Sequence, residues 1–319
     1  MLDVITVGSA TMDVFSVIGQ KVRECKLGDK ILVKDIAFQT GGGGINAAAG
    51  LSRMGLNVGF LGKVGDDHNG HTVIKELKEE KIKVIPVPFS DYHTSHSYIL
   101  KSSKEKDRLL FAYKGASDHL LYSDFKKSAL HTRWIYMATL LGKSFKTAEK
   151  IAVYAGKQEI KLLFNPSTYL AKKGKFYLRT ILKNTTILVL NKSEAKLLLK
   201  NPSNNIKDIV RSLHKLGPDI VVVTEGPKGI NAFDGSTLYY LPAYKVRVVS
   251  TTGAGDAMAS GFLAGVFLKN DLVHALEMGM ANAASVIQYS GTKNKLLTHR
   301  QAHTFVQSRK EKVIVKRLD

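Results

Sequence analysis

The chain has one cysteine in 319 residues, Cys25, so it can form no internal disulfide bond and no thiolate cluster for zinc. Its ten histidines are scattered, and no H-E-x-x-H pair occurs. No apolar run approaches the roughly 18 residues that a membrane-spanning helix needs. The N-terminus begins as a strand, without the pattern of a signal peptide. These absences predict a cytoplasmic protein with no membrane partner and no directly bound metal.

Acidic residues are few: 27 Asp and Glu stand against 47 Lys and Arg, and the formal charge is +20. Such an excess suits nucleic-acid binding, but the lysines are spread through nearly every predicted helix, with short clusters only at Ala171–Lys175 and Arg309–Arg317. Nucleic acid is therefore not the expected partner. The C-terminal sequence KEKVIVKR remains open to two interpretations, a strand or a basic tail that contacts polyanions.

A P-loop is also missing. The sequence LGKS at Leu141–Ser144 resembles the end of one, but the motif requires a glycine at the position of Met137. A nucleotide would have to bind at a site built from a different motif.

Apolar strands alternate with helical stretches along the whole chain, without a repeat or a low-complexity linker. This pattern predicts an α/β fold with three layers, a doubly wound and mostly parallel sheet between two layers of helices. We expect a single domain over residues 1–319. Short apolar patches without helical period, at about 14–40 and 94–113, predict additional strands outside the main sheet.

The most informative stretch is KVRVVSTTGAGDAMASGFLAGVFLK, Lys245–Lys269. It predicts a strand at Val246–Val249, a turn of small residues and a long helix. Free backbone N–H groups at the start of this helix would bind an anion, and small residues let a phosphate approach. Asp256 would repel that phosphate, so we interpret it as a base that accepts a proton from a second substrate. The alternative is a carboxylate that only complements the helix dipole.

Two further features suggest a polyol site. Gly41–Gly44 precede a predicted helix, and Asn46 offers a donor and an acceptor to adjacent hydroxyl groups. Asp13 follows the strand Val4–Val7, at the edge where open α/β sheets bind ligands. A turn or cap is the alternative role for Asp13.

The two glycine motifs, STTGAGDAMASGF and TGGGGINAAAGLSRMG, resemble the two signatures of the ribokinase-like, or PfkB, carbohydrate kinases. The resemblance implies transfer of the γ-phosphoryl group of ATP to a hydroxymethyl group of a pentose or related sugar. A nucleoside acceptor is the alternative within the family, and a non-catalytic sugar or nucleotide sensor is the alternative outside it. The resemblance also implies that the additional strands form a lid sheet, which excludes water and could pair two subunits.

The resemblance assigns a role to each motif residue. It implies that Asp256 is the catalytic base. The backbone N–H groups of Gly253, Ala254 and Gly255 would stabilise the negative charge that develops on the phosphoryl group. The acceptor would be bound by Asp13, Gly42, Gly43 and Asn46.

The nucleotide and Mg²⁺ are expected at the ends of three later strands. Asn191 and Glu194 would hold Mg²⁺ through water; spacing alone favours a capping box for this pair. The loop that resembles the T-x-G-x-x-G motif contributes Thr224, Gly226, Lys228 and Gly229 as contacts to the phosphates. Asn282, in a predicted helix at Leu272–Tyr289, either leaves room for adenine or serves close helix packing.

Two positions depart from the family pattern. Gly43 stands where ribokinases carry lysine, which puts free ribose in doubt and suits a bulkier acceptor. Ser250 replaces the aspartate that helps to bind an activating monovalent cation, so the case for such a cation is weakened. Neither change touches the predicted base.

Overall fold

The computed structural model describes residues 1–104, 108–201 and 203–318. Within them, ten strands form one large sheet in the order β14-β13-β12-β11-β10-β9-β8-β1-β4-β5. The seven strands from β11 to β5 in this order are parallel to one another, and β12, β13 and β14 pair antiparallel. The strands are β1 (Leu2–Val7), β4 (Val58–Leu61), β5 (Lys83–Val84), β8 (Thr132–Met137), β9 (Lys161–Phe164), β10 (Ile187–Asn191), β11 (Ile220–Thr224), β12 (Ile230–Phe233), β13 (Thr237–Leu241) and β14 (Ile314–Arg317).

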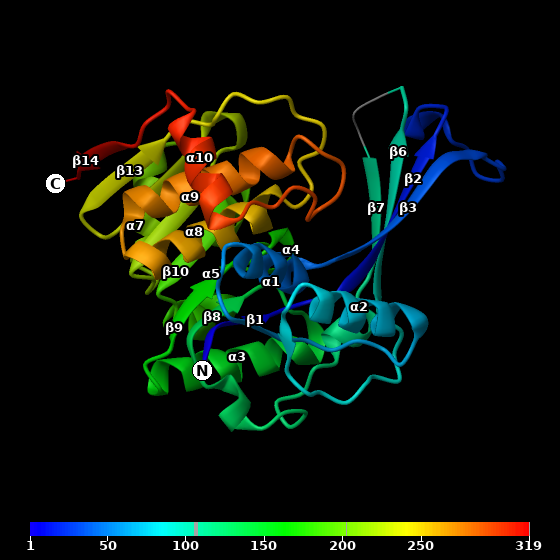
Figure 1. Cartoon of the computed structure of the whole chain (residues 1–319), viewed down its shortest axis with the longest axis horizontal. Helices are drawn as coiled ribbons and strands as arrows, with labels where there is room; N and C mark the ends of the chain where they lie inside the picture. Colours follow the sequence, from blue (N-terminus) through cyan, green and yellow to red (C-terminus); the bar gives the residue numbers. More distant parts are fainter. Residues whose placement is uncertain (105–107, 202, 319) are drawn as a thin grey trace.

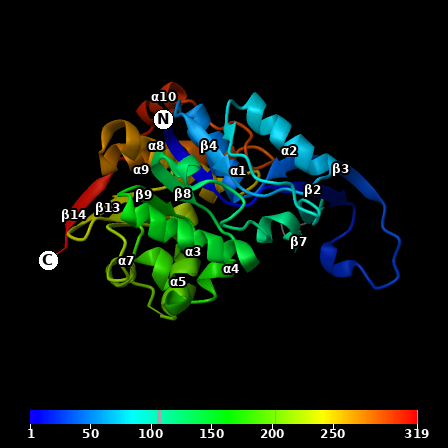
Figure 2. The same ribbon diagram turned by 90° about the horizontal axis from the view of Figure 1, so that it is seen from below.

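Helices cover both faces of this sheet (Figure 2). One layer holds α1 (Gly43–Arg53), α2 (His68–Glu79), α8 (Ala254–Lys269), α9 (Leu272–Val286) and α10 (His299–Gln307). The other holds α3 (Gly142–Lys157), α4 (Thr168–Ala171), α5 (Lys175–Leu182), α6 (Lys192–Leu199) and α7 (Ile206–His214). The predicted three-layer, mostly parallel α/β fold is confirmed, whereas the single-domain organisation stays a prediction.

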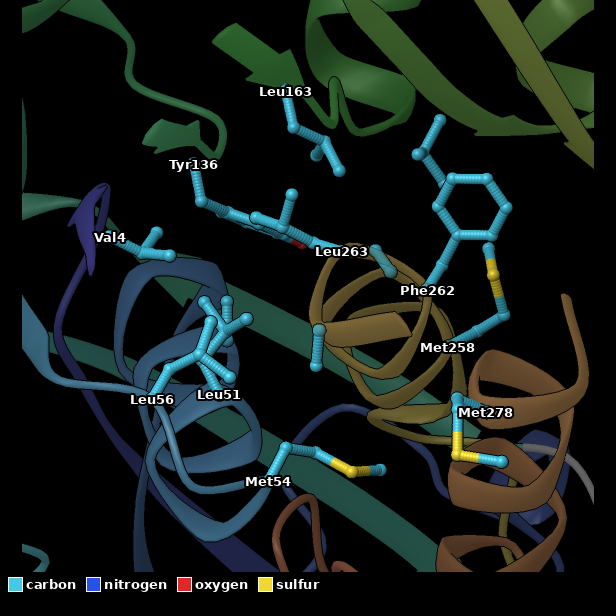
Figure 3. Packing of buried hydrophobic residues seen from close by; sticks show 14 of the residues in the cluster. Val4, Leu51, Met54, Leu56, Tyr136, Leu163, Met258, Phe262, Leu263 and Met278 are labelled. Atoms are coloured by element: carbon cyan, nitrogen blue, oxygen red, sulfur yellow. The ribbon is translucent and has the colours of Figure 1, made fainter. Parts of the chain in front are cut away.

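The two layers follow from the alternation of side chains along each strand. Val4 packs with the layer of α1 and α8, whereas Ile5 packs with the layer of α3 and α5. Figure 3 shows the first of these cores, in which Phe262 and Leu263 of α8 lie against Tyr136 and Leu163 of the sheet. Burial of α8 in this core holds its N-terminus at a defined place above the sheet.

Four strands form the separate lid sheet, in the order β3-β2-β6-β7. They are β2 (Thr11–Ile18), β3 (Val33–Gly41), β6 (Ser95–Ser102) and β7 (Arg108–Tyr113). Figure 1 shows the lid standing at one end of the large sheet. The expected small sheet is confirmed, although residues 19–32, inside the first predicted range, contain no strand.

The strand predicted at Val246–Val249 is wrong. This segment is irregular, and the N–H groups of Val249 and Ser250 both donate to Ile287 O at the end of α9. Side chains of Val248 and Val249 are more than half exposed, so the apolar run does not mark a buried strand. The helix expected to reach Tyr289 ends at Val286.

The basic C-terminal segment forms a strand, the first of its two interpretations, because β14 pairs with β13. Within the described ranges, no helix has the length and apolar character needed to cross a bilayer.

Candidate active site

The first turn of α8 presents backbone donors at its open end. Among the described residues, the N–H groups of Gly253, Gly255 and Asp256 have no hydrogen-bond acceptor. That of Ala254 is partly engaged, because it donates to Thr251 O at 3.3 Å. Free N–H groups and the positive end of the helix dipole together favour an anion. Of the three predicted phosphoryl donors, Gly253 and Gly255 are therefore better placed than Ala254.

Glycine is required at the start of this turn. Gly253 has φ of 82°, and a Cβ there would lie 2.6 Å from the carbonyl oxygen of Thr292. A Cβ at Gly255 would instead meet no atom within 4 Å. The backbone at Gly255 thus borders open space that a phosphate could fill.

Asp256 lies in the same turn, next to these donors. Its Oδ2 accepts a hydrogen bond from Asn46 Nδ2 at 2.8 Å. The pKa of this carboxyl group is raised to about 6, mainly because the surrounding protein removes most of its hydration. The hydrogen bond from Asn46 lowers the pKa, and the charges of Asp13 and Glu194 raise it. A carboxyl group with this pKa is ionised at neutral pH and takes up a proton more readily than an exposed aspartate.

A cavity of about 240 Å³ lies between the lid and the large sheet, and we call it the inner cavity. The structure brings Asp13, Gly42, Gly43 and Asn46 together in its wall, beside Asp256. They come from β2, the turn before α1 and α1 itself, whereas Asp256 comes from α8. The cavity therefore collects all four predicted acceptor residues around the candidate base.

The glycine turn brings backbone close to this cavity. Gly42 has φ of 98°, and a Cβ there would lie 2.6 Å from the carbonyl oxygen of Ser9. A Cβ at Gly43 would lie 3.0 Å from that of Ala138. Without side chains at these positions, the wall of the cavity is backbone.

Asp13 is 7% exposed, on the lid face that also carries Ser97. Burial raises its pKa to about 6, opposed by a hydrogen bond from Ser97 and by the positive charges of Lys293 and Lys114. Sequence reasoning missed Lys114 and Asp118, which also line the cavity. Both follow β7 of the lid sheet, and only the folded structure brings the end of this strand to the inner cavity.

A second cavity, of about 580 Å³, borders the other side of the α8 N-terminus, and we call it the apolar cavity. Thr224, Gly226 and Gly229 line it, together with Ala254 and Gly255. Most of its surface comes from apolar side chains of the segment before α8, of α8, and of α9 and the residue that follows it: Val246, Val248, Met258, Met280, Ala283, Ala284 and Ile287. An apolar cleft that ends at free N–H groups suits a nucleotide, with the base among the apolar side chains and the phosphates at the helix.

A third cavity adjoins the apolar cavity and is lined by Asn191 and Lys228. Asn191 and Glu194 form a capping box: Asn191 Oδ1 accepts from the N–H of Glu194 at 2.9 Å, and Glu194 Oε2 accepts from that of Asn191 at 3.0 Å. Burial raises the pKa of Glu194, opposed by hydrogen bonds from Asn191 and Thr168. The cap that spacing favoured is present, and a role towards Mg²⁺ stays a prediction.

Asn282 lies apart from these cavities. It is fully buried, its Nδ2 donates to Ala257 O at 2.8 Å, and its Oδ1 accepts from the N–H of Leu297 at 3.0 Å. A side chain so engaged packs α9 against α8, the second of its two predicted roles. The neighbouring Ala283 and Ala284 line the apolar cavity instead.

Residues 1–299 match the family model described as pfkB family carbohydrate kinase. The chain belongs to this family. The pfkB match spans both glycine motifs and every predicted site residue, and the protein is an ATP-dependent carbohydrate kinase.

Individual pfkB relatives are similar to this chain over nearly its full length. A ribokinase from Bacillus subtilis is 26% identical over 306 residues, covering 94% of this chain and 98% of the ribokinase. A 5-dehydro-2-deoxygluconokinase from Clostridium tetani is 29% identical, covering 97% of this chain and 94% of its own. The ribokinase of Arabidopsis thaliana, solved with ribose and ATP, aligns with a TM-score of 0.83 at 20% identity, over 97% of this chain and 99% of that one. This last likeness shows the fold.

The pKa values at the inner cavity predict the pH dependence of this pfkB kinase. With the pKa values of Asp256 and Asp13 both about 6, kcat/KM should be level above about pH 7 and fall as the pH drops through 6, because protonation removes the candidate base. Initial rates between pH 5 and 8.5 would check this. A profile that stays flat down to pH 5 would contradict the role of Asp256.

Proposed function

We propose that this kinase transfers the γ-phosphoryl group of ATP to a hydroxymethyl group of a neutral sugar, with a pentose ranked first. The observation that carries the proposal is the position of Asp256: it lines the inner cavity in the same helical turn in which Gly255, with its free N–H group, lines the apolar cavity. An acceptor on one side and a nucleotide on the other would meet at this turn.

The reaction follows from the groups at that turn. Asp256 accepts the proton of the acceptor hydroxyl as the hydroxyl oxygen forms a bond to the γ-phosphorus and the bond to the β-phosphate oxygen breaks, which releases ADP. The N–H groups of Gly253 and Gly255 stabilise the negative charge on the transferred group. Asp13 and the backbone of Gly42 and Gly43 orient the acceptor hydroxyls.

The charge of the inner cavity favours a neutral acceptor. Its wall carries three carboxylates, Asp13, Asp118 and Asp256, against the one ammonium group of Lys114, a formal charge of −2. A sugar phosphate or a sugar acid would meet net repulsion there. The volume of about 240 Å³ lies below the 300–1,000 Å³ typical of sites for drug-sized ligands, which suits a monosaccharide. A nucleoside is the second candidate, because Gly43 contributes no side chain to the wall.

An acceptor panel tests this proposal. ADP release should appear with neutral pentoses, hexoses or nucleosides and stay near background with sugar phosphates and sugar acids. Asp256→Asn should lower kcat by about 10²–10⁴-fold through loss of the base while ATP still binds. The control is Asp66→Asn, whose carboxylate is exposed outside the three cavities. Normal turnover by Asp256→Asn would refute the mechanism, and a strong preference for a charged sugar would refute the acceptor class.

Mg²⁺ would be supported by Asn191, which lines the third cavity, and by Glu194, its partner in the capping box. Among the described residues, no cluster of three or more His, Cys, Asp or Glu could hold a metal directly. Glu194 is a carboxylate whose pKa is raised by burial, and its oxygens keep lone pairs for metal-bound water. Mg²⁺ commonly binds through phosphates and waters in this way, and it would neutralise phosphate charge.

Glu194→Gln should raise the Mg²⁺ concentration for half-maximal activity severalfold, because the amide keeps the shape and loses the charge. Titration of activity with Mg²⁺ at saturating ATP would measure this. Glu79→Gln, on the exposed face of α2, is the matched control. Equal Mg²⁺ dependence in all three proteins would remove Glu194 from the site.

We also propose that two copies pair through their lids. Phe38, Tyr98 and Phe111 lie in one row across the lid, joined by the strand register, on the face opposite Asp13. Each is more than half exposed. Val14 lies between Phe38 and Tyr98 in this row and is buried. Exposed aromatic side chains on one face favour contact with another protein surface, and a second copy offers the same face.

Light scattering should give the mass of a dimer, and Phe38→Ser with Phe111→Ser should give that of a monomer. Phe176→Ser, at a 75% exposed phenylalanine outside the lid, should leave the mass unchanged. A monomeric wild-type protein at micromolar concentration would contradict the pairing.

A further inference from the structure

Thr292 lies next to the candidate base and reaches it only through another side chain. Its hydroxyl donates to Asn46 Oδ1 at 3.0 Å, and Asn46 Nδ2 donates to Asp256 Oδ2 at 2.8 Å. Thr292 and Asn46 are each 4% exposed, so water has little access to replace either bond. Three side chains from three distant segments thus form one directed chain of hydrogen bonds that ends on the carboxylate.

The donor-to-acceptor direction of these hydrogen bonds depends on the orientation of the amide of Asn46. An asparagine amide can present either its NH₂ group or its oxygen to a neighbour. Only the NH₂ group stabilises an ionised carboxylate, and this leaves the amide oxygen, buried, in need of a donor. The hydroxyl of Thr292 is that donor. Because hydrogen bonds in a chain polarise one another, it also strengthens the bond from Asn46 to Asp256.

Thr292 is held from both sides. Its carbonyl oxygen packs against Gly253, where a Cβ would come within 2.6 Å. The next residue, Lys293, binds Glu76 of α2 and Thr40 of β3 through its Nζ. Its side chain is 11% exposed, so this ion pair is largely shielded from water. The segment that carries Thr292 is therefore fixed between the start of α8 and the base of the lid.

We propose that Thr292 is a positioning residue that fixes the amide of Asn46 in the orientation that donates to Asp256. Lys293 keeps Thr292 at this place by its bonds to β3 and α2. The inference rests on the proposed function in one respect, that Asp256 is the base; the chain of hydrogen bonds can be tested without turnover.

Replacement of Thr292 by valine removes the hydroxyl and keeps the shape. The ionised form of Asp256 then loses part of its support, so the pKa of its carboxyl should rise. A loss worth one ordinary hydrogen bond corresponds to a shift of roughly half to one unit. The low-pH limb of the kcat profile should move upward by the same amount, and kcat at pH 6 should fall about two- to fivefold.

The experiment compares wild type, Thr292→Val, Thr292→Ser and Thr304→Val. Serine keeps the hydroxyl and should restore the wild-type profile. Thr304→Val makes the same chemical change on α10, where the hydroxyl of the exposed threonine donates to Arg300 O. Thr292→Ala repeats the test if the valine variant does not fold. The first readout is kcat against pH with the best acceptor of the panel.

The second readout is the pH titration of the Asp256 carboxyl carbon by NMR, with the signal assigned by its loss in Asp256→Asn. An upward shift in Thr292→Val alone supports the positioning role. An unchanged titration, or an equal shift in Thr292→Ser or Thr304→Val, overturns it. Because this readout needs no turnover, it separates failure of the hydrogen-bond chain from failure of the proposed function, which would appear as a wild-type protein that phosphorylates no acceptor.

Discussion

A carboxylate that has lost most of its hydration lies at the N-terminus of α8, and much of the surrounding structure serves to hold it there. Burial alone would keep Asp256 protonated well above the usual range. The bond from Asn46 and the positive end of the helix dipole oppose that effect. The balance leaves a group that is charged at neutral pH and still able to accept a proton, which is the property a general base needs.

This balance requires a helix end that does not move. Helix α8 is buried along most of its length between the large sheet, α1 and α9 (Figure 3). Its close contact with α9 depends on small residues such as Gly265, where a Cβ would lie 2.6 Å from Ala275 Cα. The core thus sets the position of the first turn of α8, and the inner and apolar cavities are lined by residues of this turn.

The net charge of the inner cavity is opposite in sign to the net charge of the whole chain. The chain carries a formal +20, yet the inner cavity carries a formal −2. The excess of lysine can attract ATP from a distance, whereas an acceptor in the inner cavity would meet a local field of the opposite sign. Lys114, within the cavity and near Asp13 and Asp118, limits the repulsion among the carboxylates and keeps the site able to bind hydroxyl groups.

Much of this organisation is encoded in local sequence. Alternating strands and helices indicate the layered sheet because each element buries an apolar face of fixed period. The glycines at 42 and 253 indicate their turns because both adopt φ values that other residues rarely adopt. Local pattern failed where burial depends on distant neighbours. Val246–Val249 has the pattern of a strand, but the N–H of Val249 donates to Ile287 O after α9, and no strand among the described residues pairs with the segment.

The sequence by itself determined the family, the fold class and the residues around the candidate base, since these depend on short motifs with strict steric demands. Only the tertiary structure decided which atoms meet. Asn46 and Asp256 are 210 positions apart and Thr292 is 246 from Asn46, so no spacing rule could join them. The pKa of a carboxyl group likewise depends on every atom packed around it, and that packing exists only once the lid, α1 and α8 are assembled.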